Sequence, residues 1–494
     1  MRYWGVPEPH PTITAERPRL TSQAPAASAP RIRTAIELAI VVLVAAVMGF
    51  WALDQANIGP DELVYQQAGL RYALGDTSPN PEHPPVAKYL LGAWQLVFGA
   101  GVMSARVLLG CVLVAAVLVA YAWLRAAAGG TTALIVAVML ATTHRVNGAD
   151  FIDRQVLLDP FSVLFGMSAL ALLWQWERRR NLLLAIAAGL LMALAILSKA
   201  SAAVLVIAAL ACVPWRELRD GAVWRAVLAF VATGVAVCLL AYVPLGGIGA
   251  VIEMIEFQSA HALQGHPIVV AGEEHRYAPW YAPLWFGGEV VGWFALAAVV
   301  AWAAIATVLR GRQRIVRVLV LAALATLVAL SASPVGLPHY TTAWLWPLLL
   351  LTGIGVTALW AGARRWPARA LVVVAAAALL VGPVTGAAHI LTLRPTGVAL
   401  IDRAMLEHPA PDGTVLTLQL SPLITDPNID APVTIDPSLE GITAVAIGHD
   451  PRFVAPHEVL AALADAEEPV LLDDIRLYLL DEPLDALLAG ATAP

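Results

Sequence analysis

Runs of about 20 apolar residues recur along most of the chain, and they constrain its fold more than any other feature. A helix of this length crosses a ~30 Å hydrocarbon core. Only 13% of the 494 residues are charged, and the mean hydropathy is +0.74. Soluble domains carry about 25% charged residues. The sequence therefore predicts an all-α polytopic membrane protein with membrane lipid as its surroundings and no nucleic-acid partner.

Eleven apolar segments are expected to span the membrane. They are residues 35–54, 104–125, 131–144, 156–176, 181–198, 201–215, 225–246, 284–309, 318–333, 341–361 and 369–389. If the N-terminus is inside, the inner segments hold most of the arginines, including Arg178 to Arg180 and the four between 310 and 317. Because basic residues favour the cytoplasmic side, we predict the N-terminus inside and the C-terminus outside.

The composition divides the chain into three parts. Residues 1–34 are polar and rich in proline, which predicts a disordered cytoplasmic tail. Residues 35–392 form the predicted transmembrane domain. Residues 393–494 lose the long apolar runs and carry many acidic residues. Their short segments "GTVLTLQL", "ITAVAIG" and "EPVLLDDI" resemble strands, and "PHEVLAALADA" has helical spacing. We expect a small acidic α/β domain outside the cell.

The ionisable residues gather at one face of the predicted membrane domain. They lie in the outer loops 57–94, 144–159, 198–201, 253–283 and 334–340. A transporter usually carries charges or broken helices near the membrane midplane instead. The pattern therefore favours a site at the outer membrane boundary, in a multi-pass protein of the cell inner or plasma membrane. A lipid-linked transporter or flippase is the alternative, and a non-catalytic envelope scaffold is a further one.

The positions of the lysines support this location, because only two of the 30 basic residues are lysines. Both Lys88 and Lys199 fall in predicted outer loops. A lysine is a compact point charge that suits phosphate. Each of the two could instead be an interface residue that extends its charge into water.

The first outer loop is the most crowded. In "GPDELVYQQAGLRYAL" a helix is expected to begin at Pro60, with Asp61 and Glu62 in its first turn. Acidic residues there can simply complement the helix dipole. "EHPPVAKYLLG" then predicts a second helix after two prolines, with His83 before it and Lys88 one turn in.

Several motifs resemble one superfamily. The Asp-Glu pair, "HPP" with a following lysine, "DRQVLLDPFSVLF", "LSKAS", "HALQGHPIVVAGEEHRYAPWYAPLWF" and "GLPHYTTAWLWPLLLL" occur in the same order. They are similar to motifs of protein O-mannosyltransferases and of bacterial polyprenyl-phosphate-dependent glycosyltransferases such as the aminoarabinose transferases. The resemblance covers residues 35–390 and implies the GT-C fold. The chain lacks the large inserted luminal β-domain of the eukaryotic enzymes.

The resemblance implies transfer of one sugar from a polyprenyl-phosphate donor to a hydroxyl of a protein, lipid or envelope glycan. On that basis Asp61 is expected to be the base, and Glu62 to support it or position the acceptor. Lys88, Arg154 and Lys199 are the candidates for the donor phosphate. The sugar and acceptor candidates are His83, Asp159, His266, Trp280, Tyr281, His339 and Tyr340.

No metal or other cofactor is required by these residues. Three histidines on separate loops are a weak metal signal, and a divalent metal has no further support in the sequence. The three cysteines all lie within apolar runs and are read as small buried side chains. We therefore expect neither a zinc site nor a disulfide framework.

Overall fold

The computed structural model describes most of the helical part of the chain and much of the C-terminal part. The described residues are 29–55, 60–143, 154–393, 401, 414–419, 433–434, 438, 440–448, 455–464, 468–472 and 475–491. Most of the predicted tail, residues 1–28, lies outside them.

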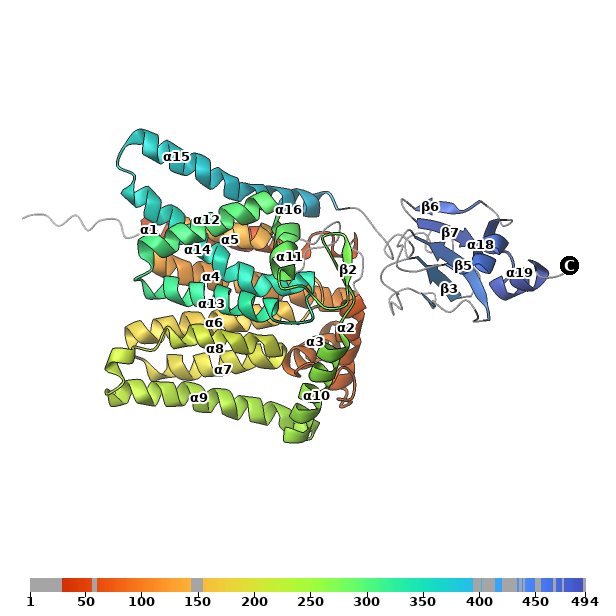
Figure 1. The fold of residues 1–494 in the computed structure, drawn as a ribbon, viewed down its shortest axis with the longest axis horizontal. Helices are drawn as coiled ribbons and strands as arrows, with labels where there is room; N and C mark the ends of the chain where they lie inside the picture. Colours follow the sequence, from red (N-terminus) through yellow and green to blue (C-terminus); the bar gives the residue numbers. More distant parts are fainter. Residues whose placement is uncertain are drawn as a thin grey trace, which may run out of the picture.

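The helical part is a bundle of long helices with shorter elements at one end (Figure 1). Its helices are α1 (Ala29–Phe50), α2 (Pro60–Ala73), α3 (Val86–Phe98), α4 (Val102–Ala128), α5 (Gly130–Thr143), α6 (Asp159–Arg179), α7 (Leu182–Ser198), α8 (Leu205–Leu210), α9 (Gly221–Tyr242), α10 (Ile248–Gln264), α11 (Ala282–Val291), α12 (Trp293–Arg310), α13 (Arg314–Ser331), α14 (Thr342–Gly362), α15 (Trp366–Ala377) and α16 (Val381–Leu391). The hairpin of β1 (Ile268–Val270) and β2 (Glu273–His275) is antiparallel.

Each predicted span overlaps a helix or a pair of helices. Seven helical stretches of the described chain are long and apolar enough to cross a membrane, and shorter apolar helices accompany them. The number of crossings and their orientation remain predictions. The first helix starts earlier than predicted, because Pro30 is tolerated within a first turn. The span predicted at 284–309 is broken at Gly292, whose φ of +86° interrupts the helix between α11 and α12.

Two short helices bring the first loop into place. α2 and α3 pack closely because glycines meet between them: a Cβ on Gly92 would overlap the carbonyl oxygen of Gly69. Gln66 and Gln95 add a buried hydrogen bond of 2.6 Å between the same helices. With α10 and the β1–β2 hairpin they lie at the right-hand end of the bundle in Figure 1.

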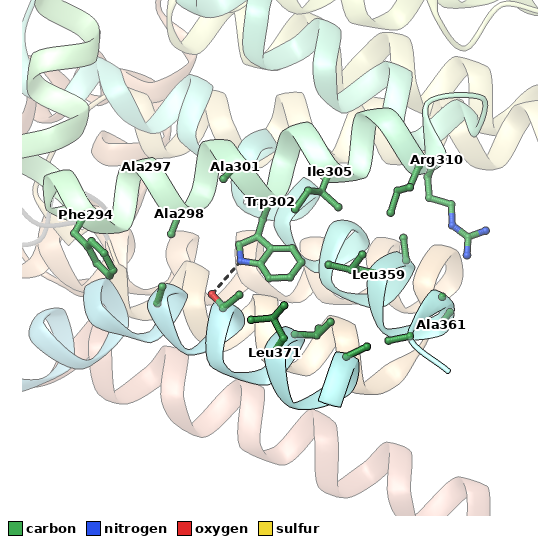
Figure 2. A pocket seen from close by; sticks show the side chains of 18 residues that line it. Phe294, Ala297, Ala298, Ala301, Trp302, Ile305, Arg310, Leu359, Ala361 and Leu371 are labelled. Carbon is green, nitrogen blue, oxygen red and sulfur yellow. Dashed lines mark hydrogen bonds between the residues drawn. The ribbon is translucent and has the colours of Figure 1, made fainter. Parts of the chain in front are cut away.

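An apolar groove of about 1160 Å³ separates α15 from α12 and from the end of α14 (Figure 2). Alanines make up much of its lining, and the indole of Trp302 donates a hydrogen bond of 3.3 Å to the carbonyl of Ala375. Arg310 lies at one end of the groove. Since the lining offers hydrocarbon and a single charge, the groove suits contact with lipid chains rather than chemistry.

The C-terminal part contains a five-stranded sheet in the order β4-β3-β5-β7-β6. Its elements are β3 (Thr414–Leu418), β4 (Val433–Thr434), β5 (Ile442–Ile447), α18 (His457–Ala464), β6 (Val470–Leu472), β7 (Ile475–Leu479) and α19 (Leu484–Ala491). β3 is parallel to β4 and β5, whereas β7 is antiparallel to β5 and β6. The predicted strands and helix of this α/β domain are confirmed.

Candidate functional site

Five chain segments bring polar side chains together at one end of the bundle. Helix α6 begins at Asp159, and the antiparallel α7 ends just before Lys199, so these two residues meet. The short 3-10 helix Pro338–Thr341 adds His339 and Tyr340. The first turn of α2 and the segment between α2 and α3 supply the remaining members. Helix ends that share one face of a bundle thus assemble residues far apart in sequence.

An ion pair forms the centre of this cluster. The Nζ atom of Lys199 lies 2.7 Å from each carboxylate oxygen of Asp159. It also lies 3.6 Å from the centre of the Tyr340 ring, in a cation–π contact. Nε2 of His339 lies 3.7 Å from the same carboxylate. All four were candidates from the sequence, and the structure brings them together.

Asp61 lies beside this cluster with its carboxylate uncommitted to any described residue. It is within electrostatic range of Lys199, His339, Tyr340 and Tyr65. Its side chain is partly buried and has no hydrogen bond or ion pair to any residue that the structure describes. A carboxylate in this state can accept a proton or a hydrogen bond from a ligand.

Tyr65 is a member of the cluster that the sequence analysis missed. Its hydroxyl lies 3.3 Å from Nε2 of His83. Burial, and then the charge of Asp61, raise the pKa of Tyr65, so it stays a neutral phenol. Burial and the positive charges of Lys199 and Lys88 lower the pKa of His83 to about 3. The spacing could have identified Tyr65, because a residue four positions after Asp61 lies on the same face of the helix.

Glu62 is held in a buried ion pair. Its side chain is 1% exposed, and its carboxylate binds Arg106 through contacts of 2.8 and 2.9 Å. It also accepts a hydrogen bond of 2.9 Å from the backbone N–H of Val156. In this structure Glu62 ties α2 to α4 and to the segment just before α6, and its expected role in supporting the base or positioning the acceptor stays a prediction.

Lys88 is also committed within the protein. Its ammonium group is buried and donates to the Tyr72 hydroxyl at 2.8 Å, the Asn80 carbonyl at 2.5 Å and the His83 carbonyl at 2.8 Å. A lysine has three N–H donors, so none is left for a phosphate in this structure. These bonds hold the segment that carries His83 against α3, and the expected contact of Lys88 with the donor phosphate stays a prediction.

Arg154 likewise binds other parts of the protein. It is 1% exposed and donates to the backbone carbonyls of Met48, Trp51 and Ala52 near the end of α1. Carbonyls at a helix C-terminus lack partners within the helix, and a cation there also suits the helix dipole. Its expected contact with the donor phosphate stays a prediction, and in this structure its guanidinium binds the end of α1.

The other candidates lie on and near the β1–β2 hairpin. The His266 ring is 5.6 Å from that of His261, and Trp280 is 69% exposed with its ring 5.9 Å from Tyr281. Within the described structure, none of these residues forms a hydrogen bond or an ion pair with Asp61. Among the described residues, no group of three or more metal-ligating side chains could hold an ion.

We expect replacement of Lys88 by methionine to lower stability first. One buried acceptor, on Tyr72, and two partly buried carbonyls would lose their donor, which costs about 1–3 kcal/mol. Donor binding would weaken only through the displaced His83 segment. Thermal melting and donor affinity can be measured together, with Arg71→Met as the matched control because Arg71 forms an exposed pair with Asp76. Unchanged melting with lost donor affinity would instead make Lys88 a direct phosphate ligand.

Comparison with known proteins confirms the resemblance. Residues 82–246 match the sequence model of the dolichyl-phosphate-mannose-protein mannosyltransferase family. This segment contains His83, Asp159 and Lys199 but neither Asp61 nor His339. A search of curated proteins gave no match.

Solved structures share the fold along most of the chain. ArnT from Cupriavidus metallidurans in the apo state has a TM-score of 0.57 at 17% identity, covering 93% of this chain and 99% of that one. The same protein bound to undecaprenyl phosphate has a TM-score of 0.56 at 16% identity, with the same coverage. An oligosaccharyltransferase from Archaeoglobus fulgidus has a TM-score of 0.50 at 11% identity, covering 76% and 58% of the two chains. The predicted GT-C fold is thus confirmed.

Proposed function

We propose that this protein is an integral membrane glycosyltransferase that moves a single sugar from a polyprenyl-phosphate donor to an acceptor hydroxyl. The active site faces the outside of the cell, and Asp61 is the base. Sequence similarity to mannosyltransferases over residues 82–246 and the fold shared with ArnT support the reaction class. The ArnT structure with undecaprenyl phosphate supports the class of donor.

One observation carries the choice of Asp61. Among the described residues, four carboxylates lie in or next to the cluster, and three of them have partners. Asp159 binds Lys199, Glu62 binds Arg106, and Glu82 accepts a hydrogen bond from the Asn80 side chain. Asp61 has no hydrogen bond or ion pair within the described chain. A base must be able to receive the proton of the acceptor without first breaking a buried ion pair. Asp61 meets that condition.

The proposed reaction needs little acid catalysis. The acceptor oxygen forms a bond to the anomeric carbon as the bond from that carbon to the phosphate oxygen breaks. The electron pair leaves with the polyprenyl phosphate, and the acceptor proton passes to Asp61. Because the leaving group is already a stable anion, a second carboxylate of the kind that protonates the leaving sugar in glycosidases is not required. The central demand is to hold the phosphate and align the acceptor.

Lys199 is the cation proposed to hold the phosphate. Its ammonium donates hydrogen bonds to both carboxylate oxygens of Asp159 and lies over the ring of Tyr340. An entering phosphate would share the ammonium with Asp159, while His339, Tyr340 and Tyr65 supply neutral hydrogen-bond donors. These neutral donors add affinity without the cost of burying further charge.

The sugar and acceptor would bind next to this phosphate position. His83 is neutral and placed by its bond to Tyr65, so it can contact a sugar hydroxyl. His266, Trp280 and Tyr281, which flank the β1–β2 hairpin in the chain, are proposed to contact the acceptor or the sugar face. No divalent metal is assigned a role. The C-terminal domain, residues 393–494, is proposed to lie outside the membrane with the site.

A pair of substitutions tests the phosphate assignment. Lys199→Gln should weaken donor binding about tenfold to a hundredfold, since a hydrogen bond to a charged group is worth roughly 1.5–3 kcal/mol. Asp159→Asn removes a competing anion and should leave donor binding equal or tighter. The measurement is binding of polyprenyl-phosphate sugar to purified protein, normalised to the folded fraction from thermal melting, because either substitution breaks a buried ion pair. Equal losses of donor affinity in both variants would show that the pair is only structural.

A further inference from the structure

A cavity lined by several arginines lies at the opposite end of the bundle from Asp61. Helix α6 begins in the cluster at Asp159 and runs 21 residues, about 30 Å at 1.5 Å per residue, to the far end. There a cavity of about 1310 Å³ opens between α8, the end of α12 and the start of α13. Trp215 lines it, and its indole donates a hydrogen bond of 3.0 Å to the carbonyl of Leu210.

The cavity combines free cations with fixed ones. Arg314 is held by Glu177 at 3.3 Å and by the carbonyl of Cys212 at 2.9 Å, and Glu217 in the lining is bound by Arg180 at 2.9 Å. The three remaining arginines of the lining are exposed and have no hydrogen bond from their side chains and no ion pair within the part of the chain described here. They are Arg216, Arg312 and Arg317.

An apolar strip continues from these arginines. Ile207 and Leu210 on α8 are each 47% exposed, and Leu321 on α13 is 36% exposed. All three line the same cavity. Arginine forks match phosphate oxygens, and the strip matches a hydrocarbon chain. A soluble anion would use only the arginines, whereas a zwitterionic lipid would carry a cation into an already positive cavity.

We propose that this cavity binds an anionic phospholipid. Its phosphates lie among Arg216, Arg312 and Arg317, and an acyl chain lies along the strip formed by Ile207, Leu210 and Leu321. Three uncompensated arginines favour a head group with two phosphates over one with a single phosphate. Basic pockets between helices on the cytoplasmic side are suited to such head groups. This site is separate from the transfer site and does not depend on the proposed transfer reaction.

The test measures lipid binding to the full-length, delipidated protein in detergent by native mass spectrometry. The probe is cardiolipin, a phospholipid with two phosphates, and phosphatidylcholine is the zwitterionic comparison. Each near-surface arginine should contribute about fivefold, so the variant Arg216→Gln/Arg312→Gln/Arg317→Gln should bind cardiolipin about a hundredfold more weakly. Phosphatidylcholine should bind both proteins weakly and equally.

The matched control removes three exposed arginines that do not line this cavity. They are Arg219, Arg364 and Arg365. This control should keep cardiolipin affinity within about twofold. All three proteins should melt at the same temperature without lipid. An equal loss of cardiolipin affinity in the control would mean that the arginines attract the lipid only through their overall positive charge. Displacement of cardiolipin by an equal concentration of inorganic phosphate would make this a soluble-anion site. Either result would overturn the proposal.

Discussion

Replacing Asp61 by asparagine is expected to reduce turnover by roughly 10² to 10⁴, the usual contribution of a general base. Asparagine keeps the shape and one acceptor oxygen but cannot take the acceptor's proton. Because the Asp61 carboxylate has no partner in the described chain, the substitution breaks no contact there. The loss should therefore appear in the rate and not in the fold.

Two control measurements separate this from a structural effect. Donor affinity and melting temperature of Asp61→Asn should match the parent, with any stability change below about 1 kcal/mol because asparagine substitutes well near a helix N-terminus. If the variant turns over at the parent rate on its true acceptor, Asp61 has no part in the mechanism.

The neighbouring carboxylate should behave in the opposite way. Glu62→Gln leaves Arg106, itself 2% exposed, without its bidentate counter-charge. Removing one partner of a buried ion pair costs about 3–5 kcal/mol. We expect a large fall in melting temperature, and any loss of activity should follow the fraction of folded protein. The measurements are a thermal unfolding curve in detergent and turnover at several temperatures, normalised to the fraction of folded protein.

A double variant provides the matched control. Glu62→Met with Arg106→Met removes both charges together, and apolar pairs of similar volume are often neutral or stabilising in place of buried ion pairs. Its stability should return towards that of the parent, with turnover retained. A stable Glu62→Gln protein with turnover reduced as far as in Asp61→Asn would instead return Glu62 to the chemistry.

The sequence predicted what local patterns determine. Apolar runs located the helices of the bundle, and proline positions gave the start of α2 at Pro60 and of α3 just after Pro85. Because α6 and α7 are consecutive and antiparallel, the start of α6 at Asp159 and the end of α7 next to Lys199 lie at the same end of the bundle. Much of the candidate cluster could therefore be predicted from local patterns alone.

The sequence could not show which charges are already satisfied. Glu62 and Arg106 are 44 positions apart, and Arg154 reaches carbonyls more than 100 positions away. Lys88 donates to backbone carbonyls of a segment that looks irregular in sequence. A one-dimensional pattern identifies ionisable residues but not their partners. For this reason three of the expected functional side chains proved to be fastened within the scaffold.

Partner occupancy also separates Asp61 from Glu62, which the sequence places side by side. Successive residues of a helix point about 100° apart. Glu62 therefore points into the bundle and binds Arg106, whereas Asp61 points towards the polar cluster. The same rotation places Tyr65 on the side of Asp61, one turn later.

The most direct measurement of the proposed reaction follows both halves of the donor. Vesicles containing the full-length protein would receive polyprenyl-phosphate sugar labelled in the sugar and in the lipid, with an envelope extract as acceptor. We expect equal amounts of released polyprenyl phosphate and transferred sugar from the parent, and almost none of either from Asp61→Asn. Intact donor recovered on the other side of the bilayer, with no sugar transferred by the parent protein, would contradict a glycosyltransferase and indicate a lipid transporter.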